Sequence, residues 1–196
     1  MDDRPPGIRR VCVAAAWDRA AGGNATASDQ RRLVREALIS ACASAGLQRG
    51  LPCQQRHGRA EVLLLPTGID EPRVLAQLTR SVGAELRRIN AAGGGRRLRV
   101  ALAFHEGIVA LEPSGFSGVA IGRACRLAVA PETRSAMASH PAADLIVLLT
   151  DRIFDDLREQ PDSAFGTARF ERVDIEDPAV GRRTAWLCAP ALPQPA

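Results

Sequence analysis

Two long amphipathic segments, separated by short apolar runs, constrain the fold of this chain most strongly. Between residues 29 and 45, apolar side chains recur three and four residues apart, and Gly46 follows the last of them. A second stripe with the same spacing begins after Asp70, and its last apolar position is Ile89. Residues at these spacings share one face of a helix, so each segment is predicted to be a helix that buries one face.

The segments around these two helices are typical of buried strands. Gly58 separates two short apolar runs and is predicted to form the turn of a hairpin. Gly107 separates two more runs, and a second hairpin is predicted there. The predicted strands cover residues 11–16, 51–56, 60–65, 98–104, 108–111, 144–149, 170–175 and 184–188.

Shorter helices complete the predicted element order. Ser28 or Asp29 is expected to cap the first long helix, and Thr150 or Asp151 a short late helix. A further helix is expected after Gly118, with Arg123 and Arg126 together on a face separate from its buried one. The order predicts an α/β (α+β) domain with a mixed, mostly antiparallel sheet and helices largely on one face.

The composition favours a single intracellular domain. Residues 1–8 are expected to form a tail, residues 9–189 the domain and residues 190–196 a disordered C-terminal tail. The N-terminus does not resemble a secretory signal, and no apolar run reaches the roughly 18 residues of a membrane span, so a cytoplasmic protein without membrane contact is predicted.

The charge pattern does not indicate nucleic-acid binding. All 26 basic residues are arginine, which we attribute to the codon usage of a GC-rich genome, and they are scattered among 22 acidic residues. An RNA-binding ferredoxin-like domain is disfavoured as well, because the aromatic-rich strands that stack bases are absent.

No pattern of metal-binding or nucleophilic residues stands out. The five cysteines are odd in number and lack CxxC spacing, which favours buried free thiols over a zinc site or disulfides. His105-Glu106 is not followed by the second histidine of a metalloprotease motif, so His105 is interpreted as a strand-end histidine with an ordinary hydrogen bond. We therefore predict no metal and no cofactor.

One stretch of the sequence resembles a known family. Residues Gly115-Phe-Ser-Gly118-Val-Ala-Ile-Gly-Arg-Ala-Cys-Arg126-Leu127 are similar to the Gly-x-x-Gly-x-x-Val-Asn-x-Ala-x-Arg-Leu motif of class III nucleotidyl cyclase domains. Weaker similarity occurs at Phe104-His-Glu-Gly107, at 150–154 and at 184–188. The resemblance covers about residues 9 to 189, and it implies a ferredoxin-like sandwich elaborated as in these cyclases.

The residues that carry the family's chemistry are mostly replaced. The resemblance implies two carboxylates that hold two divalent metals. The first position falls on or near Ala14 and the second on Arg59, and neither side chain can ligate a metal. The asparagine of the motif is Gly122, whereas its arginine is present as Arg126. The chain is therefore predicted to have no catalytic residues, and Arg59 and Arg126 are the candidate substrate-binding residues.

Two alternatives remain open at this stage. Asp18 or Glu61 restores a metal ligand if the alignment shifts by a few residues. The resemblance also implies sites at a head-to-tail dimer interface, so a heterodimeric cyclase whose partner supplies the carboxylates is the second hypothesis. The favoured prediction is an inactive, dimerising regulatory module that binds a nucleotide without metal.

Overall fold

The structure is a computed structural model, and every residue named below belongs to its described part. The described ranges are 7–18, 26–47, 53–92, 97–112, 115–159, 165, 168–178 and 181–190. The predicted C-terminal tail after Pro190 and residues 1–6 of the predicted N-terminal tail lie outside these ranges. Gly7 and Ile8 of that tail belong to the first strand.

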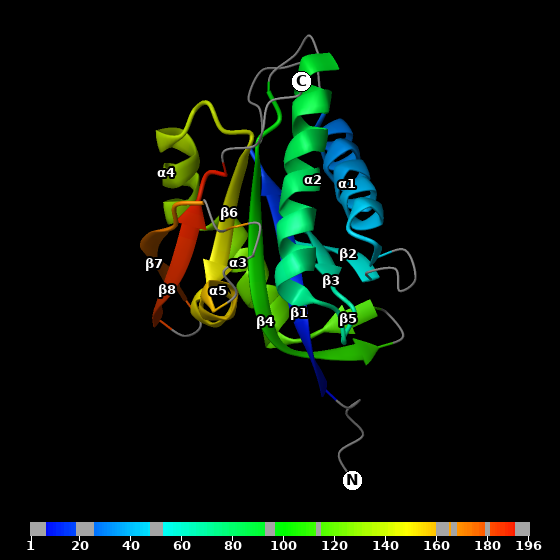
Figure 1. Cartoon of the computed structure of the whole chain (residues 1–196), viewed down its shortest axis with the longest axis vertical. Helices are drawn as coiled ribbons and strands as arrows, with labels where there is room; N and C mark the ends of the chain where they lie inside the picture. The colour runs from blue at the N-terminus through cyan, green and yellow to red at the C-terminus, as the bar shows by residue number, and fades with distance from the viewer. Residues whose placement is uncertain are drawn as a thin grey trace.

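One mixed sheet forms the centre of the described domain (Figure 1). Its strand order is β2-β3-β1-β4-β6-β8-β7, with β5 beside β4. Among the described strands, β4 and β6 pair in parallel and the other pairs are antiparallel, which confirms the predicted mixed sheet. The strands are β1 (Gly7–Trp17), β2 (Cys53–His57), β3 (Ala60–Leu64), β4 (Val100–Glu112), β5 (Gly115–Ser117), β6 (Leu145–Thr150), β7 (Glu171–Asp177) and β8 (Gly181–Cys188).

Helices cover both faces of this sheet, so the prediction of helices largely on one face is wrong. The helices are α1 (Ala27–Ser44), α2 (Glu71–Ala92), α3 (Val119–Val129), α4 (Pro131–Ser139) and α5 (Asp151–Arg158). One core cluster joins the sheet to α1, α2 and α5, and a second joins it to α3 and α4. The reason is that all residues from Val11 to Ala16 are buried, so the central strands present two apolar faces to be covered.

The two faces differ in side-chain size. Toward α3, the central strands present small residues such as Ala14, Ala16 and Ala103. Toward α1 and α2 they present larger ones, including Leu102 and Phe104. Small side chains allow a close approach, so α3 lies tightly on the sheet.

The predicted hairpin at Gly107 is wrong, because β4 passes through this residue as one continuous strand. A Cβ built on Gly107 meets Ala120 Cβ of α3 at 2.7 Å. Gly107 therefore makes room for the helix and does not form a turn. The strand that returns along β4 is β5, and Gly118 follows it with φ 142°, where a Cβ would lie 2.7 Å from the Ile108 carbonyl oxygen.

The start of α1 and the presence of α4 also differ from the predictions. Thr26, not Ser28 or Asp29, caps α1: its hydroxyl accepts from Asp29 N–H at 3.1 Å, and the Asp29 carboxylate accepts from Thr26 N–H. No helix is predicted at the position of α4, which begins at Pro131. Proline at the first helical position is a start signal, because the missing N–H has no partner there in any helix.

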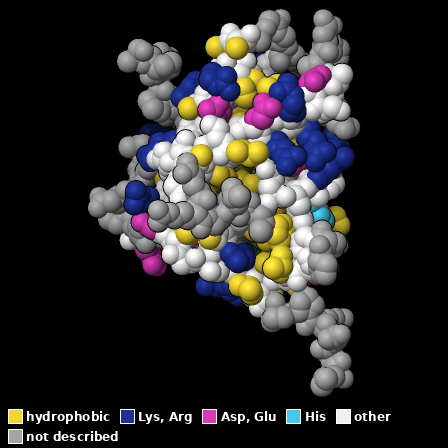
Figure 2. Space-filling view, turned by 90° about the vertical axis from the view of Figure 1, so that its right-hand side faces the viewer, with side chains coloured by type: hydrophobic (Ala, Val, Ile, Leu, Met, Phe, Trp, Pro, Cys, Tyr) yellow, Lys and Arg dark blue, Asp and Glu magenta, His cyan; other side chains and the backbone are white. Residues whose placement is uncertain are grey.

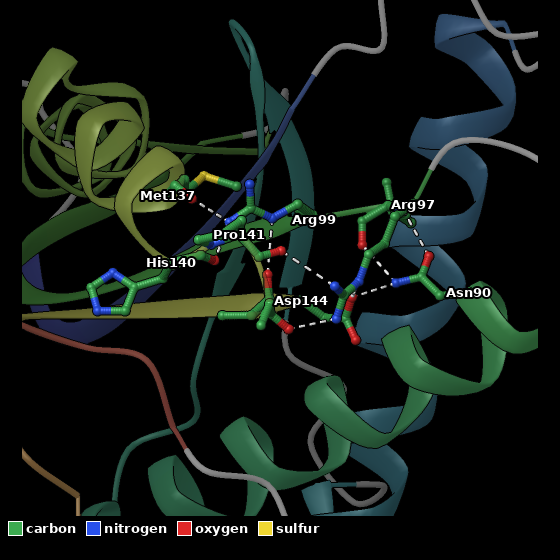
Figure 3. Close-up of polar contacts among 10 residues, drawn as sticks. Asn90, Arg97, Arg99, Met137, His140, Pro141 and Asp144 are labelled. Atoms are coloured by element: carbon green, nitrogen blue, oxygen red, sulfur yellow. Dashed lines mark hydrogen bonds and ion pairs between the residues drawn. The ribbon is translucent and has the colours of Figure 1, made fainter.

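A cluster of polar contacts joins the end of α2, the start of β4 and the loop after α4 (Figure 3). Asp144 accepts hydrogen bonds from Arg97 and, at 2.7 Å, from Asn90 Nδ2. Arg99 donates to the carbonyl oxygens of Met137, of His140 at 2.7 Å and of Ala143 at 2.9 Å. These contacts fix the end of α4 against the sheet.

Charged side chains of both signs occur on the face of the molecule that Figure 2 shows. The face shown in Figure 2 has arginines interspersed with acidic and apolar side chains, in keeping with the predicted scatter of charge. None of the described helices is both long and apolar enough to span a membrane.

Candidate functional site

The first implied metal position lies deep inside the domain. Ala14 is fully buried and pairs with Val62 of β3 and Ala103 of β4. Its side chain belongs to the core cluster under α3. A carboxylate there would need a partner within that apolar cluster, because burying an unpaired charge is strongly unfavourable.

The second implied metal position, unlike the first, lies on the surface of the domain. Arg59 is exposed in the turn between β2 and β3. It precedes Val62, the β3 partner of Ala14, by three residues, which corresponds to about 10 Å along a strand. Ala14 and Arg59 therefore do not lie opposite each other across β1 and β3.

The two candidate replacement carboxylates differ in their surroundings. Glu61 is 2% exposed, and its carboxylate accepts from Arg31 Nε of α1 at 2.5 Å and from Gln54 Nε2 at 3.4 Å. Asp18 follows β1 with an exposed side chain, and its backbone N–H donates to the Arg99 carbonyl oxygen at 3.1 Å. Glu61 is thus engaged in packing α1, whereas Asp18 is open to solvent.

Arg126, the retained motif residue, forms an ion pair within the chain. Its Nε lies 2.9 Å from Asp177 Oδ1 at the end of β7, and the Asp177 side chain is 9% exposed. A Cβ built on Gly122 would lie 3.0 Å from Arg126 Nη1. The glycine at the family's asparagine position thus gives the guanidinium room over the helix. Arg126 faces β7 at one sheet edge, while Arg59 lies at the β2–β3 edge.

A cavity of about 330 Å³ adjoins Arg126, and Arg59 is not among its lining residues. Its wall is formed by α3, the middle of β4, the β6–α5 junction and the β7–β8 hairpin. His105 and Arg123 line it beside Arg126. This volume lies at the lower end of the range for small-molecule sites.

His105 is held neutral in the cavity wall. Burial, followed by the positive charges of Arg123 and Arg126, lowers the pKa of its imidazole to about 4, and Asp177 opposes the shift. Its Nδ1 lies 3.4 Å from Thr150 Oγ1, in keeping with the predicted ordinary hydrogen bond. Its other ring nitrogen, Nε2, is buried without a hydrogen-bond partner among the described residues.

The remaining charges around His105 come from four elements. Glu106 of β4 pairs with Arg9 of β1 at 3.0 Å and with Arg152 of α5 at 2.6 Å. Asp151 of α5 accepts from Trp186 Nε1 at 2.8 Å, and Arg183 of β8 also lines the cavity. The spacing of Arg123 and Arg126 predicts that they share a helix face. No sequence pattern indicates that His105, Asp177 and Arg183 line the same cavity.

Four described cysteines and the described acidic and histidine side chains are candidates for sulfur or metal chemistry. Burial raises the pKa of the Cys12, Cys125 and Cys188 thiols to about 12 and that of Cys42 to about 11, and these four thiols are free. Within the described ranges, no group of three or more His, Cys, Asp or Glu side chains is placed to hold a metal ion.

Comparison with known proteins identifies the fold. No protein-family model matches the sequence, and no curated protein is significantly similar to it. Solved structures are similar over nearly the whole chain. An adenylate/guanylate cyclase/hydrolase from Silicibacter pomeroyi has 17% identity and a TM-score of 0.62, with 94% of this chain and 99% of that chain covered.

Other solved cyclases show the same similarity. The adenylyl cyclase CyaB from P. aeruginosa has 10% identity and a TM-score of 0.56, with 97% and 100% covered. The guanylate cyclase domain of RhGC from Catenaria anguillulae, solved with GTP, has 10% identity and a TM-score of 0.53, with 92% and 95% covered. The chain therefore has the fold of class III adenylate and guanylate cyclase domains, which confirms the resemblance implied by residues 115–127.

Proposed function

We propose that this chain is a cyclase-homology domain without cyclase activity, which dimerises and acts as a regulatory module. One observation carries the proposal: at the positions implied for metal ligands stand a buried alanine, Ala14, and an exposed arginine, Arg59. Without both carboxylates, two metals have no ligands with which to neutralise a triphosphate and activate a hydroxyl.

The neighbouring acidic residues support this proposal. Glu61 is committed to Arg31, so recruiting it for a metal would break an ion pair whose acid is 2% exposed. The Arg31 side chain is 37% exposed, so this loss should cost less than the about 3–5 kcal/mol that is typical of a fully buried pair. Asp18 alone supplies a single carboxylate, which is fewer than a two-metal site needs.

The heterodimeric alternative is less favoured by the geometry. In a heterodimeric cyclase, Arg126 would be the residue of this chain that stabilises the transition state. Here its guanidinium is paired with Asp177, and Gly122 offers no side chain for the companion asparagine role. Recruitment of Arg126 would leave the mostly buried Asp177 without this partner.

Nucleotide binding in this proposal uses Arg59 and Arg126 from two chains. These residues lie toward opposite edges of one sheet, so a single chain does not bring them into one cavity. In the proposed head-to-tail dimer, Arg59 of one protomer lies opposite Arg126 of its partner. Each guanidinium then offers forked hydrogen bonds to phosphate oxygens, without a metal.

The decisive experiment is a cyclase assay on the purified chain with ATP or GTP and Mg²⁺ or Mn²⁺. We expect no cyclic nucleotide above a no-enzyme blank. The assay is repeated with the variants Asp18→Asn and Glu61→Gln. Product that disappears in either variant overturns the proposal, since it shows that a carboxylate has taken over the metal site.

Two measurements test the binding and the assembly. Calorimetry with ATP, GTP and cyclic nucleotides should show binding that persists in EDTA and weakens in Arg59→Ala and Arg126→Ala, but not in Arg35→Ala, an exposed arginine of α1. Light scattering should give a dimer mass at micromolar concentration. A monomer mass, or equal affinity in all variants, contradicts the dimeric nucleotide site.

A further inference from the structure

Two buried nitrogens point to an unassigned ligand site. Nε of Arg123 and Nε2 of His105 are both buried, and neither has a hydrogen-bond partner among the described residues. Both residues line the 330 Å³ cavity between α3 and β8. Most buried polar groups in folded proteins are paired, and an unpaired one costs about 1–3 kcal/mol. A ligand that pairs with these nitrogens recovers that cost.

The charge of the cavity wall selects an anion. Five arginines line it, against the three carboxylates of Glu106, Asp151 and Asp177. Glu106 pairs with two of these arginines and Asp177 with a third. Arg123 and Arg183 form no ion pair with a described carboxylate, so two positive charges are in excess. A dianion neutralises this excess, which a monoanion does only in part.

Part of the cavity wall is apolar. Leu127 of α3, Ile175 of β7 and Ala185 of β8 line it, with exposed fractions of 6%, 4% and 1%. An inorganic anion alone leaves these side chains without contact. A ligand with an apolar body and a doubly charged head fills both parts of the cavity.

We infer that this cavity binds a small organic phosphate monoester within a single chain, with its phosphate against Arg123 and His105. A phosphate monoester carries close to two negative charges near neutral pH and has three acceptor oxygens. Arg123 and Arg183 offer forked donors for them. The site requires neither Arg59 nor a second protomer, so it does not depend on the proposed dimeric nucleotide site.

The first test is calorimetry in EDTA with adenosine 5′-monophosphate, inorganic phosphate and, as the uncharged control, adenosine. We expect adenosine 5′-monophosphate to bind more tightly than phosphate, and adenosine to bind least. Arg123→Gln should weaken the monophosphate at least tenfold. Arg35→Gln removes the same charge from α1 and should change affinity less than twofold.

A second variant protects the test against misfolding. Arg183 is exposed on β8, so Arg183→Gln should fold normally and weaken the monophosphate severalfold. Circular dichroism melts of all variants identify any that unfold. Absence of binding by every probe at about 10 millimolar, or full affinity in both Arg123→Gln and Arg183→Gln, overturns the inference. Equal affinity for phosphate and the monophosphate overturns the organic part of it.

The protonation of His105 gives an independent readout. Sulfate is the probe, because it does not titrate between pH 5 and 8. An anion beside Nε2 favours the imidazolium, so sulfate should raise the pKa of His105 in NMR titrations and bind more tightly as the pH falls. His105→Asn should remove the larger part of this pH dependence. A His105 pKa that sulfate does not change overturns the placement of the anion.

Different results contradict the dimeric nucleotide site and the single-chain phosphate site. Arg59→Ala should leave the monophosphate affinity unchanged, whereas it should weaken the triphosphates in the dimeric site. If Arg59→Ala weakens the monophosphate and Arg123→Gln does not, the single-chain site is wrong and the dimeric one stands. If the purified chain makes cyclic nucleotide, the proposal of an inactive regulatory module fails. The calorimetry with the monophosphate and with phosphate still decides whether the single-chain phosphate site exists.

Discussion

Replacing Gly107 by alanine should destabilise the domain through one contact. The new Cβ would lie 2.7 Å from Ala120 Cβ and 3.7 Å from Ala120 Cα. Carbon atoms in contact prefer about 3.5–4.0 Å, so α3 and β4 must separate by about 1 Å. Overpacking of this kind costs about 1–3 kcal/mol, and alanine recovers about 0.5–1 kcal/mol over glycine in a strand. The expected loss therefore lies between about 0 and 2.5 kcal/mol, with about 1 kcal/mol near the centre of this range.

A double-mutant cycle isolates this contact. Ala120→Gly alone should cost up to about 1 kcal/mol, because glycine is a poor helix former. In the double variant Gly107→Ala/Ala120→Gly the overlapping methyl groups no longer meet, so its loss should be smaller than the sum of the single losses by about 1 kcal/mol or more. Urea unfolding followed by circular dichroism measures all four proteins. A cycle without coupling between the two substitutions refutes the tight α3–β4 contact.

Three further outcomes follow from the same structure. His105 has a pKa of about 4 in the folded state, against an ordinary value of 6.5 for a histidine. Between these values the unfolded state binds more protons, so the free energy of unfolding should fall as the pH is lowered from about 6.5 to 4, and His105→Asn should lose that part of the decrease in denaturant titrations. Arg99→Met removes the donor to three carbonyl oxygens near the end of α4, so it should cost about 2 kcal/mol and speed amide exchange there, while Arg35→Met should be neutral. Native Cys12 and Cys125 should resist alkylation at pH 8 until the protein unfolds, and rapid labelling of either in mass spectra contradicts their burial.

The sequence determined the elements with a local pattern. The stripes of α1 and α2 follow from spacings of three and four residues, and the glycine turn of the β2–β3 hairpin from residues close in the chain. The motif around residues 115–127 indicated the cyclase fold, and its Gly118 stands where the backbone passes over β4 with φ 142°. The replacements at Ala14, Arg59 and Gly122 could also be identified from the sequence alone.

The tertiary structure decided what depends on distant segments. Gly107 looks like a turn in the sequence, and only the approach of Ala120 shows why a strand needs glycine there. The two-sided cover of the sheet depends on where α3 and α4 pack, which periodicity does not specify. The cavity brings together His105, Arg123 and Arg183 from β4, α3 and β8, which are separated along the chain. Contacts between distant segments leave no local pattern in the sequence. In the sequence each of these side chains is typical of a surface or strand-end position, and only the packing of the sheet brings them together.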